Sequence, residues 1–205
     1  MNYLTFRQTF KHYTVFSLDE IRKLEPRFHR RRLTEWQEHG YITKLSRGHY
    51  IFSDLPLREE VLFEIANRIY SPSYVSFEAA LAYHKLIPEG VYAVTSAATQ
   101  KTYCLRAPVA EFIYRTVKEK LFFGYDLVTY DKKSFKMASL EKALLDYFYF
   151  RPGLRSEDDF ASLRINREMF FGQINEKRLR AFLVRFSQKA LTKRIHSFLR
   201  FLRHA

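Results

Sequence analysis

The stretch that decides the fold is residues 13–52, which read YTVFSLDEIRKLEPRFHRRRLTEWQEHGYITKLSRGHYIF. Ser17 stands just before an apolar-periodic run, and Glu20 follows it by three residues. This spacing is typical of a capping box, in which each of the two side chains bonds the backbone N–H of the other residue. A short helix is therefore expected over residues 18–24, and Pro26 is expected to interrupt it.

A second helix is predicted from Phe28 to His39, with Gly40 supplying a left-handed position that ends it. On a helical wheel, Leu33 and Trp36 share the inward face. The outward face carries Arg27, Arg31, Thr34, Glu35 and Glu38. An arginine cluster occupies the first half of this segment: Arg27, Arg30, Arg31 and Arg32.

After Gly40 the apolar period changes to two, which indicates strands over residues 41–45 and 49–52. Ser46, Arg47 and Gly48 join them as a tight hairpin. Basic side chains lie on or beside this hairpin: Lys44, Arg47 and His49.

Helix, basic helix and basic hairpin in this order indicate a winged helix-turn-helix that binds double-stranded DNA. In such modules the N-terminal half of the second helix meets base edges in the major groove. Arg27, Arg30, Arg31 and Thr34 are expected there, with Arg32 in the same cluster. The hairpin residues are expected to track phosphates or the minor groove: Lys44, Arg47 and His49. The alternative is a winged helix used only for protein contacts.

The chain has 205 residues, of which 47% are apolar and 17% aromatic, so a folded protein with a substantial core is expected. The net charge of +13 is uneven. Residues 1–50 carry ten Lys/Arg against five Asp/Glu, residues 51–172 carry sixteen of each, and residues 173–205 carry nine against one. Two basic ends around a neutral middle favour a polyanionic partner, although an acidic protein would also fit.

No apolar run is long enough to span a membrane, and no signal peptide opens the chain, so no membrane partner is expected. A single cysteine, Cys104, fits the reducing cytoplasm and is expected to be a buried small hydrophobe. No nucleotide-binding loop, hydrolase motif or metal-ligand spacing is present, so neither an enzyme nor a metal or cofactor site is predicted.

The predicted fold class is α+β, with three domains. Residues 1–54 form the winged helix-turn-helix, with a first helix in the opening dozen residues. Residues 55–150 form a small α/β domain with a mixed sheet, and residues 151–205 form a basic helical extension. In the middle domain we expect helices over 57–70, 76–88 and 140–148, and strands over 91–96, 101–106, 111–116, 121–125, 126–130 and 136–138. In the extension we expect helices starting at Ser156, Asn175 and Leu191.

The last two helices carry basic residues around an apolar face: Lys189, Lys193, Arg194, Arg200 and Arg203. A basic amphipathic pair can lie on nucleic acid, bind an acidic partner, or cover a core with a solvated outer face. All three interpretations stay open. In the middle domain, Glu141, Lys142 and Asp146 are expected to form a surface ion pair and a helix cap, and His84 is expected to be a satisfied histidine at a helix end.

The middle of the chain resembles a known family. The segment YVSFEAALAYHKLIP at residues 74–88 and the segment ASLEKALLD at residues 138–146 resemble two helix motifs of the AbiEi-type antitoxins, as does the hairpin pattern Leu45-x-Arg47-Gly48-x-Tyr50. The resemblance covers residues 10–150. It implies an N-terminal winged helix that binds inverted repeats in its own promoter and represses transcription.

The resemblance also implies a role in type IV toxin–antitoxin (abortive infection) systems, which act in phage defence. There the antitoxin counteracts a cognate nucleotidyltransferase toxin without forming a stable complex. Residues 151–205 match no part of the family pattern. The alternative function is a protein-interaction module that does not regulate its own promoter and neutralises a partner through its basic C-terminal helices.

Overall fold

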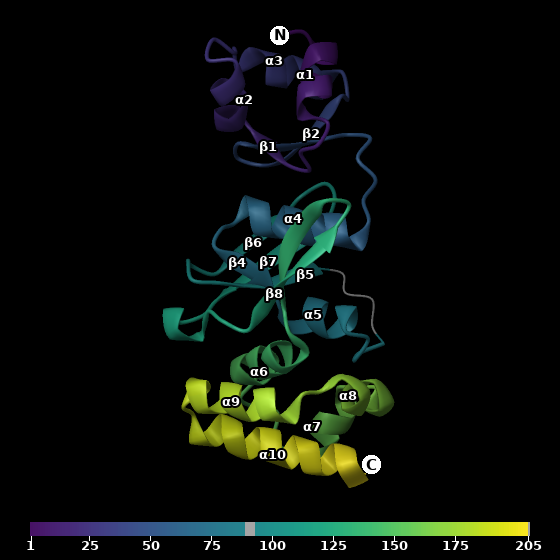
Figure 1. Cartoon of the computed structure of the whole chain (residues 1–205), viewed down its shortest axis with the longest axis vertical. Helices are drawn as coiled ribbons and strands as arrows, with labels where there is room; N and C mark the ends of the chain where they lie inside the picture. The colour runs from purple at the N-terminus through teal and green to yellow at the C-terminus, as the bar shows by residue number, and fades with distance from the viewer. Residues whose placement is uncertain (89–92, 205) are drawn as a thin grey trace.

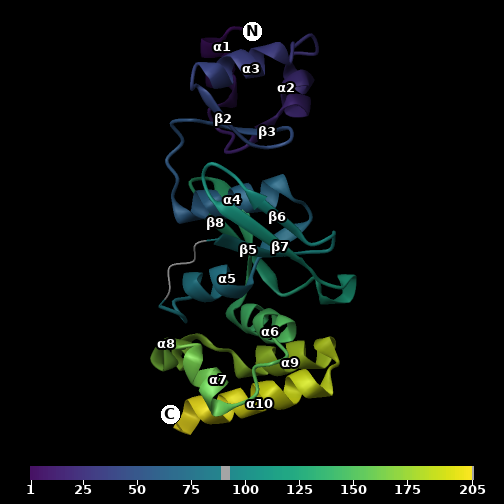
Figure 2. The ribbon, with the colours of Figure 1, turned by 180° about the vertical axis from the view of Figure 1, so that it is seen from behind.

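The computed structural model describes residues 1–88 and 93–204. The chain is elongated, with its two ends at opposite poles (Figure 1). It is an α+β protein with a small sheet near the N-terminus, a larger mixed sheet in the middle and a helical C-terminal part. Figure 2 shows the same order of layers from behind.

The N-terminal segment contains three helices and three short strands. The helices are α1 (Tyr3–Phe10), α2 (Leu18–Leu24) and α3 (Arg31–Glu38); the strands are β1 (Phe16–Ser17), β2 (Ile42–Ser46) and β3 (His49–Phe52). All strand pairs are antiparallel, in the order β1-β3-β2. The predicted capping box of Ser17 and Glu20 is confirmed at the start of α2. A separate aromatic core, with Phe6, Phe10 and Trp36 among its members, holds the helices on the sheet.

Two expectations in this segment need correction. The second helix begins at Arg31, three residues later than predicted, because residues 28–30 lie in a turn closed by the bonds of Phe28 N–H to the Glu25 carbonyl and of Arg32 N–H to the His29 carbonyl. The strand β1 was not predicted, since its two residues are too few to show a period of two. Gly40 does adopt the left-handed conformation expected after the helix, with φ of 70°.

The middle of the chain is built on a six-stranded mixed sheet, with strand order β6-β7-β5-β4-β9-β8. The strands are β4 (Ser73–Val75), β5 (Ala93–Ala98), β6 (Tyr103–Arg106), β7 (Glu111–Thr116), β8 (Tyr125–Tyr130) and β9 (Lys133–Ala138). The helices are α4 (Glu59–Ile69), α5 (Phe77–Tyr83) and α6 (Leu140–Phe150), with a short 3₁₀ turn, η1 (Glu119–Leu121). Helix α4 covers the side of the sheet toward the N-terminal segment, and α5 and α6 lie toward the C-terminal helices (Figure 1).

Most of the predicted strands are confirmed. Four expectations for this part of the chain are nevertheless not met in full. Of the strand expected over residues 121–125, only Tyr125 belongs to the sheet, as the first residue of β8, because η1 and a left-handed Gly124 turn the chain before it. Residues 73–75 form β4 immediately before α5. Cys104 is exposed, because it lies on the edge strand β6. Of the strand expected over 91–96, residues 91 and 92 lie outside the described part of the chain.

The C-terminal part consists of α7 (Glu157–Ser162), α8 (Arg167–Gln173), α9 (Glu176–Phe186) and α10 (Lys189–His204). Helix α8 was not predicted. The main hydrophobic core is continuous from Val61 in α4 through α6 to Leu202 in α10. The boundary expected at residues 150/151 therefore coincides with the end of α6, while the core continues across it.

Candidate nucleic-acid interface

Helix α3 presents one face to solvent and one to the aromatic core. Leu33 and Trp36 are buried, as predicted. The outward face carries Arg31, Thr34, Glu35 and Glu38, all exposed. The Arg31 side chain is 89% exposed and its Nε lies 3.3 Å from Oε1 of Glu35. Exposed pairs of this spacing are weak, so the guanidinium of Arg31 can leave Glu35 for another partner at little energetic cost.

The other arginines of the cluster have different positions. Arg27 and Arg30 are exposed but precede α3, in the turn that joins it to α2. Arg32 is half-buried, and its guanidinium donates to the backbone carbonyl of Met1. Three of the four arginines therefore face solvent, and Arg32 ties the start of the chain to α3.

The hairpin of β2 and β3 contacts α3 and adds two exposed cations, Lys44 and Arg47. Gly48 has φ of 88°, as the tight turn requires. His49 differs from the expectation. It is half-buried, its Nδ1 lies 3.0 Å from the Ser46 hydroxyl, and burial lowers its pKa. A neutral His49 holds the turn rather than adding a positive charge.

The small sheet is packed on both faces. One face meets the aromatic core under α3, and the other contributes Leu45 and Ile51, with the preceding Val15, to the main core of the middle domain. The hairpin thus packs against the main core as well as against α3.

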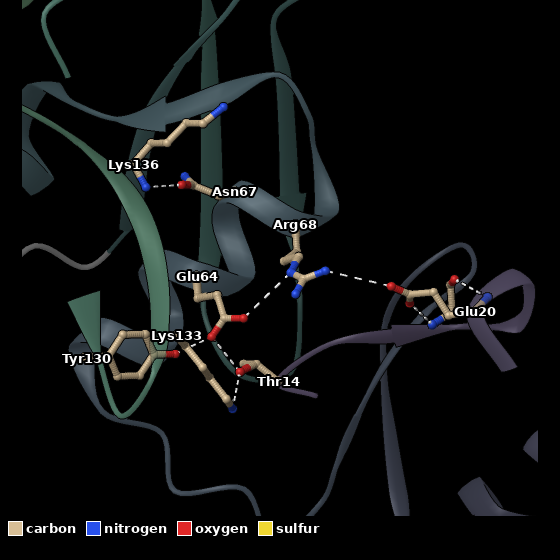
Figure 3. A network of polar contacts seen from close by, with 9 residues as sticks. Thr14, Glu20, Glu64, Asn67, Arg68, Tyr130, Lys133 and Lys136 are labelled. Atoms are coloured by element: carbon tan, nitrogen blue, oxygen red, sulfur yellow. Dashed lines mark hydrogen bonds and ion pairs between the residues drawn. The ribbon is translucent and has the colours of Figure 1, made fainter. Parts of the chain in front are cut away.

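A buried carboxylate reinforces this junction (Figure 3). Glu64 of α4 is 3% exposed and accepts a hydrogen bond of 2.6 Å from the Thr14 hydroxyl of the N-terminal segment. Tyr130 of β8 also donates to Glu64, and Lys133 of β9 donates to Thr14 over 2.7 Å. Burial and the bond to Glu64 raise the pKa of Tyr130, which keeps it a donor.

Arg68 extends this network across the junction. Its guanidinium lies 3.7 Å from Glu64 and 3.8 Å from Glu20, the capping residue of α2 (Figure 3). Sequence reasoning missed Glu64. The available signal was its place between Phe63 and Ile65, on a helix whose neighbouring positions are all apolar.

The basic residues of the C-terminal helices do not form one surface. Lys189, Lys193 and Arg200 are exposed on α10. Arg194 instead turns inward and donates to the carbonyls of Phe148 and Arg151, each over 2.8 Å. It thus caps the end of α6, and burial lowers its pKa.

Arg203, also expected on that surface, pairs with Glu176 over 2.8 Å. This surface ion pair joins α10 to the first turn of α9.

A second polar cluster lies wholly inside the middle domain. Lys142 and Asp146 of α6 are fully buried and form an ion pair, so the expected surface pair is wrong. Asp146 also accepts hydrogen bonds from the hydroxyls of Tyr74, over 2.9 Å, and Ser76, over 2.8 Å. Burial lowers the pKa of Lys142 against the attraction of Asp146. The cluster holds α6 on β4.

Glu141, the third residue of that expectation, is also fully buried. It accepts from the backbone N–H of Asn175 over 2.8 Å and pairs with Arg178 over 2.6 Å. His84 is satisfied at the end of α5, as expected, with Nε2 2.9 Å from the carbonyl of Ala138.

Within residues 1–88 and 93–204, no group of three or more metal-ligating side chains is assembled, and no helix is long and apolar enough to cross a membrane. A scan of the chain against protein-family models found no match, and no curated protein matched it. The candidate interface therefore stands on its geometry: an exposed arginine cluster around α3 beside a basic hairpin.

Proposed function

We propose that this chain is a DNA-binding regulator whose N-terminal segment acts as a winged helix. The observation that carries the proposal is the common exposure of Arg31 and Thr34 on α3 with Lys44 and Arg47 on the adjoining hairpin. Arg31 is suited to bidentate contacts with guanine, the commonest specific contact in the major groove. Lys44 and Arg47 are suited to phosphates beside the groove.

The arrangement favours sequence reading over charge alone. The outward face of α3 mixes Arg31 with Glu35 and Glu38, so its net charge is not positive. Carboxylates repel phosphates but can accept from the cytosine N4 amino group. The positive charge that forms no ion pair within the described residues comes from Arg27 and Arg30 before the helix and from Lys44 and Arg47 on the hairpin after it. Contacts with the phosphate backbone of DNA are expected at these two places.

The packing of the N-terminal segment supports this proposal. The hairpin contacts α3 directly, and the Glu64 network joins Thr14 and Glu20 of the same segment to α4, so the candidate surface is assembled before binding, which lowers the ordering cost of association. The face of α3 lies at the pole of the molecule away from the central sheet (Figure 1), where a duplex can approach.

We further propose that the regulator is an antitoxin of the AbiEi type that represses its own promoter at inverted repeats, acts in the cytoplasm and counteracts a nucleotidyltransferase toxin. This part rests on the resemblance of residues 74–88 and 138–146. In the folded chain these segments supply α5 and α6, which pack on each other in the core.

The DNA proposal is tested with Arg31→Ala and Arg47→Ala, using a duplex from upstream of the chain's own gene and a scrambled duplex. Arg31→Ala is expected to weaken specific binding by about 1–3 kcal/mol and leave scrambled DNA nearly unaffected. Arg47→Ala is expected to weaken both equally. Arg106→Ala, an 87% exposed arginine on β6, is the matched control and should change neither. Equal loss on both duplexes for Arg31→Ala would remove it from base readout.

The antitoxin proposal is tested separately, by sequencing the DNA beside the gene for a nucleotidyltransferase reading frame and co-expressing the chain with that enzyme. Restored growth is expected, and it should persist with Arg31→Ala, because neutralisation and promoter binding use different parts of the chain. No rescue by a chain that still binds its promoter would refute the antitoxin part alone.

A further inference from the structure

Helices α9 and α10 lie at the pole opposite to α3 (Figure 2), and their residues line a surface groove. Two adjoining hollows, of about 910 and 560 Å³, share the lining residues Arg180, Leu183, His196 and Arg200. We propose that this groove binds an acidic amphipathic helix of a partner protein.

The floor of the groove is apolar. Leu183 of α9 and Leu199 of α10 line it, and Val184 is 78% exposed beside them. The buried residues of α9 are Leu179, Leu183 and Phe186, whereas Val184 is a large apolar side chain of the same helix that the fold leaves exposed. The apolar area at Val184 and Leu199 is suited to the apolar stripe of a second helix.

The rim of the groove is basic. Lys189, Lys193 and Arg200 of α10 lie along it and form no ion pair within the described residues, whereas Arg180 lies opposite on α9. Glu176 is the one carboxylate in the lining, at one end, and it is already paired with Arg180 and Arg203. The rim thus attracts an acidic partner and repels a basic one.

The groove is long enough for several turns of a partner helix. Helix α9 has 11 residues and α10 has 16, which corresponds to roughly 16 and 24 Å at 1.5 Å per residue. These two antiparallel helices flank the groove, into which a partner helix can lay an i, i+3, i+4, i+7 stripe.

Nucleic acid fits less well. Single-stranded nucleic acid is held by aromatic rings on which bases stack, and no aromatic residue of the described chain lines either hollow apart from the imidazoles of His196 and His204. Phosphates also gain nothing from Leu183 and Val184. The lining therefore favours a protein helix with acidic flanks.

The probe is a labelled 16-residue peptide with leucine at i, i+3, i+4 and i+7, glutamate at four positions that flank this stripe and alanine elsewhere, titrated against the full chain by fluorescence anisotropy. A peptide of the same composition with scattered leucines controls for charge, and an oligo(dT) of equal charge controls for nucleic acid. The amphipathic peptide is expected to bind about tenfold or more tightly than either control.

Val184→Glu and Lys193→Glu test the floor and the rim, and each is expected to weaken peptide binding about tenfold. Lys177→Glu is the matched control, because Lys177 is exposed on α9 outside the groove, and it should have no effect. Circular dichroism checks that each variant is folded.

Equal binding of the scattered peptide, tighter binding of oligo(dT), or full binding by Val184→Glu would overturn the proposal. Promoter binding by Val184→Glu is expected to be unchanged, so a failure here is distinguishable from a failure of the DNA proposal.

Discussion

Replacing Asp146 with alanine tests the buried ion pair most severely. The substitution leaves the Lys142 ammonium fully buried without its carboxylate, and removal of one partner of a buried pair costs about 3–5 kcal/mol. The hydroxyls of Tyr74 and Ser76 also lose their acceptor. Partial compensation remains, because Lys142 still donates to the Tyr74 oxygen over 2.8 Å and lies 5.1 Å from the centre of the Phe123 ring.

The expected loss in the free energy of unfolding for Asp146→Ala is therefore about 4 kcal/mol, measured by urea denaturation followed by circular dichroism. The double variant Lys142→Met/Asp146→Leu should recover at least half of it, since well-packed apolar side chains can replace a buried pair. The matched control is Arg180→Ala, which breaks an exposed pair of the same spacing and should cost under about 0.5 kcal/mol. A loss as small for Asp146→Ala as for this control would refute the reasoning.

Three further predictions concern the junction and the core. Glu64→Gln should lower the free energy of unfolding by about 1–3 kcal/mol, and the N-terminal segment should unfold before the rest of the chain. The fluorescence of the single tryptophan, Trp36, reports unfolding of this segment, and a single transition at the same midpoint as in the unaltered chain would contradict the role of the junction. Burial lowers the pKa of His84, so near pH 6.5 and below the unfolded chain binds more protons than the folded chain. The free energy of unfolding should therefore fall from about pH 7 to about pH 5. His84→Gln should reduce this pH dependence, and an unaltered pH dependence would exclude His84 as its source. Gly124→Ala should cost about 1–3 kcal/mol in urea denaturation, because φ is 74° and the new methyl group would lie 2.9 Å from the Phe182 ring; a neutral result would contradict the packing.

Local signals predicted the elements that depend on local chemistry. The capping box at Ser17 formed as the spacing indicated, a helix begins after Ser156 as expected, and Gly40 ended α3 as expected. These features depend on bonds within a few residues, which the sequence displays directly. The short strands β1 and β4 were not predicted, because they have only two and three residues and form through pairing with strands farther along the chain.

Burial of charge was the main failure of prediction. A lysine and an aspartate four residues apart usually form an exposed pair, yet apart from these two and Glu141 the residues of α6 are apolar, and the helix is buried from Leu140 to Phe148. The residues flanking Lys142 and Asp146, LEKALLDYFYF, carried that signal. The inward turn of Arg194 toward the carbonyls of Phe148 and Arg151 depends on how α10 crosses α6, which no local pattern shows.

For the proposed DNA interface, the structure bears only on which side chains are exposed. Arg31, Thr34, Lys44 and Arg47 are exposed, as a groove-reading surface requires. Tertiary packing removed Arg32 and His49 from it, because each satisfies a polar group of the N-terminal segment itself.

Above all, we propose that α3 and the β2–β3 hairpin read a DNA sequence. The most direct measurement is an anisotropy titration of the full chain with the duplex upstream of its own gene and with a scrambled duplex, at two salt concentrations. We expect the chain to bind the upstream duplex about a thousandfold more tightly than the scrambled duplex, and this preference should persist as added salt weakens binding to both duplexes. Equal and steeply salt-dependent binding to the two duplexes would contradict it and reduce the basic residues to a nonspecific polyanion surface.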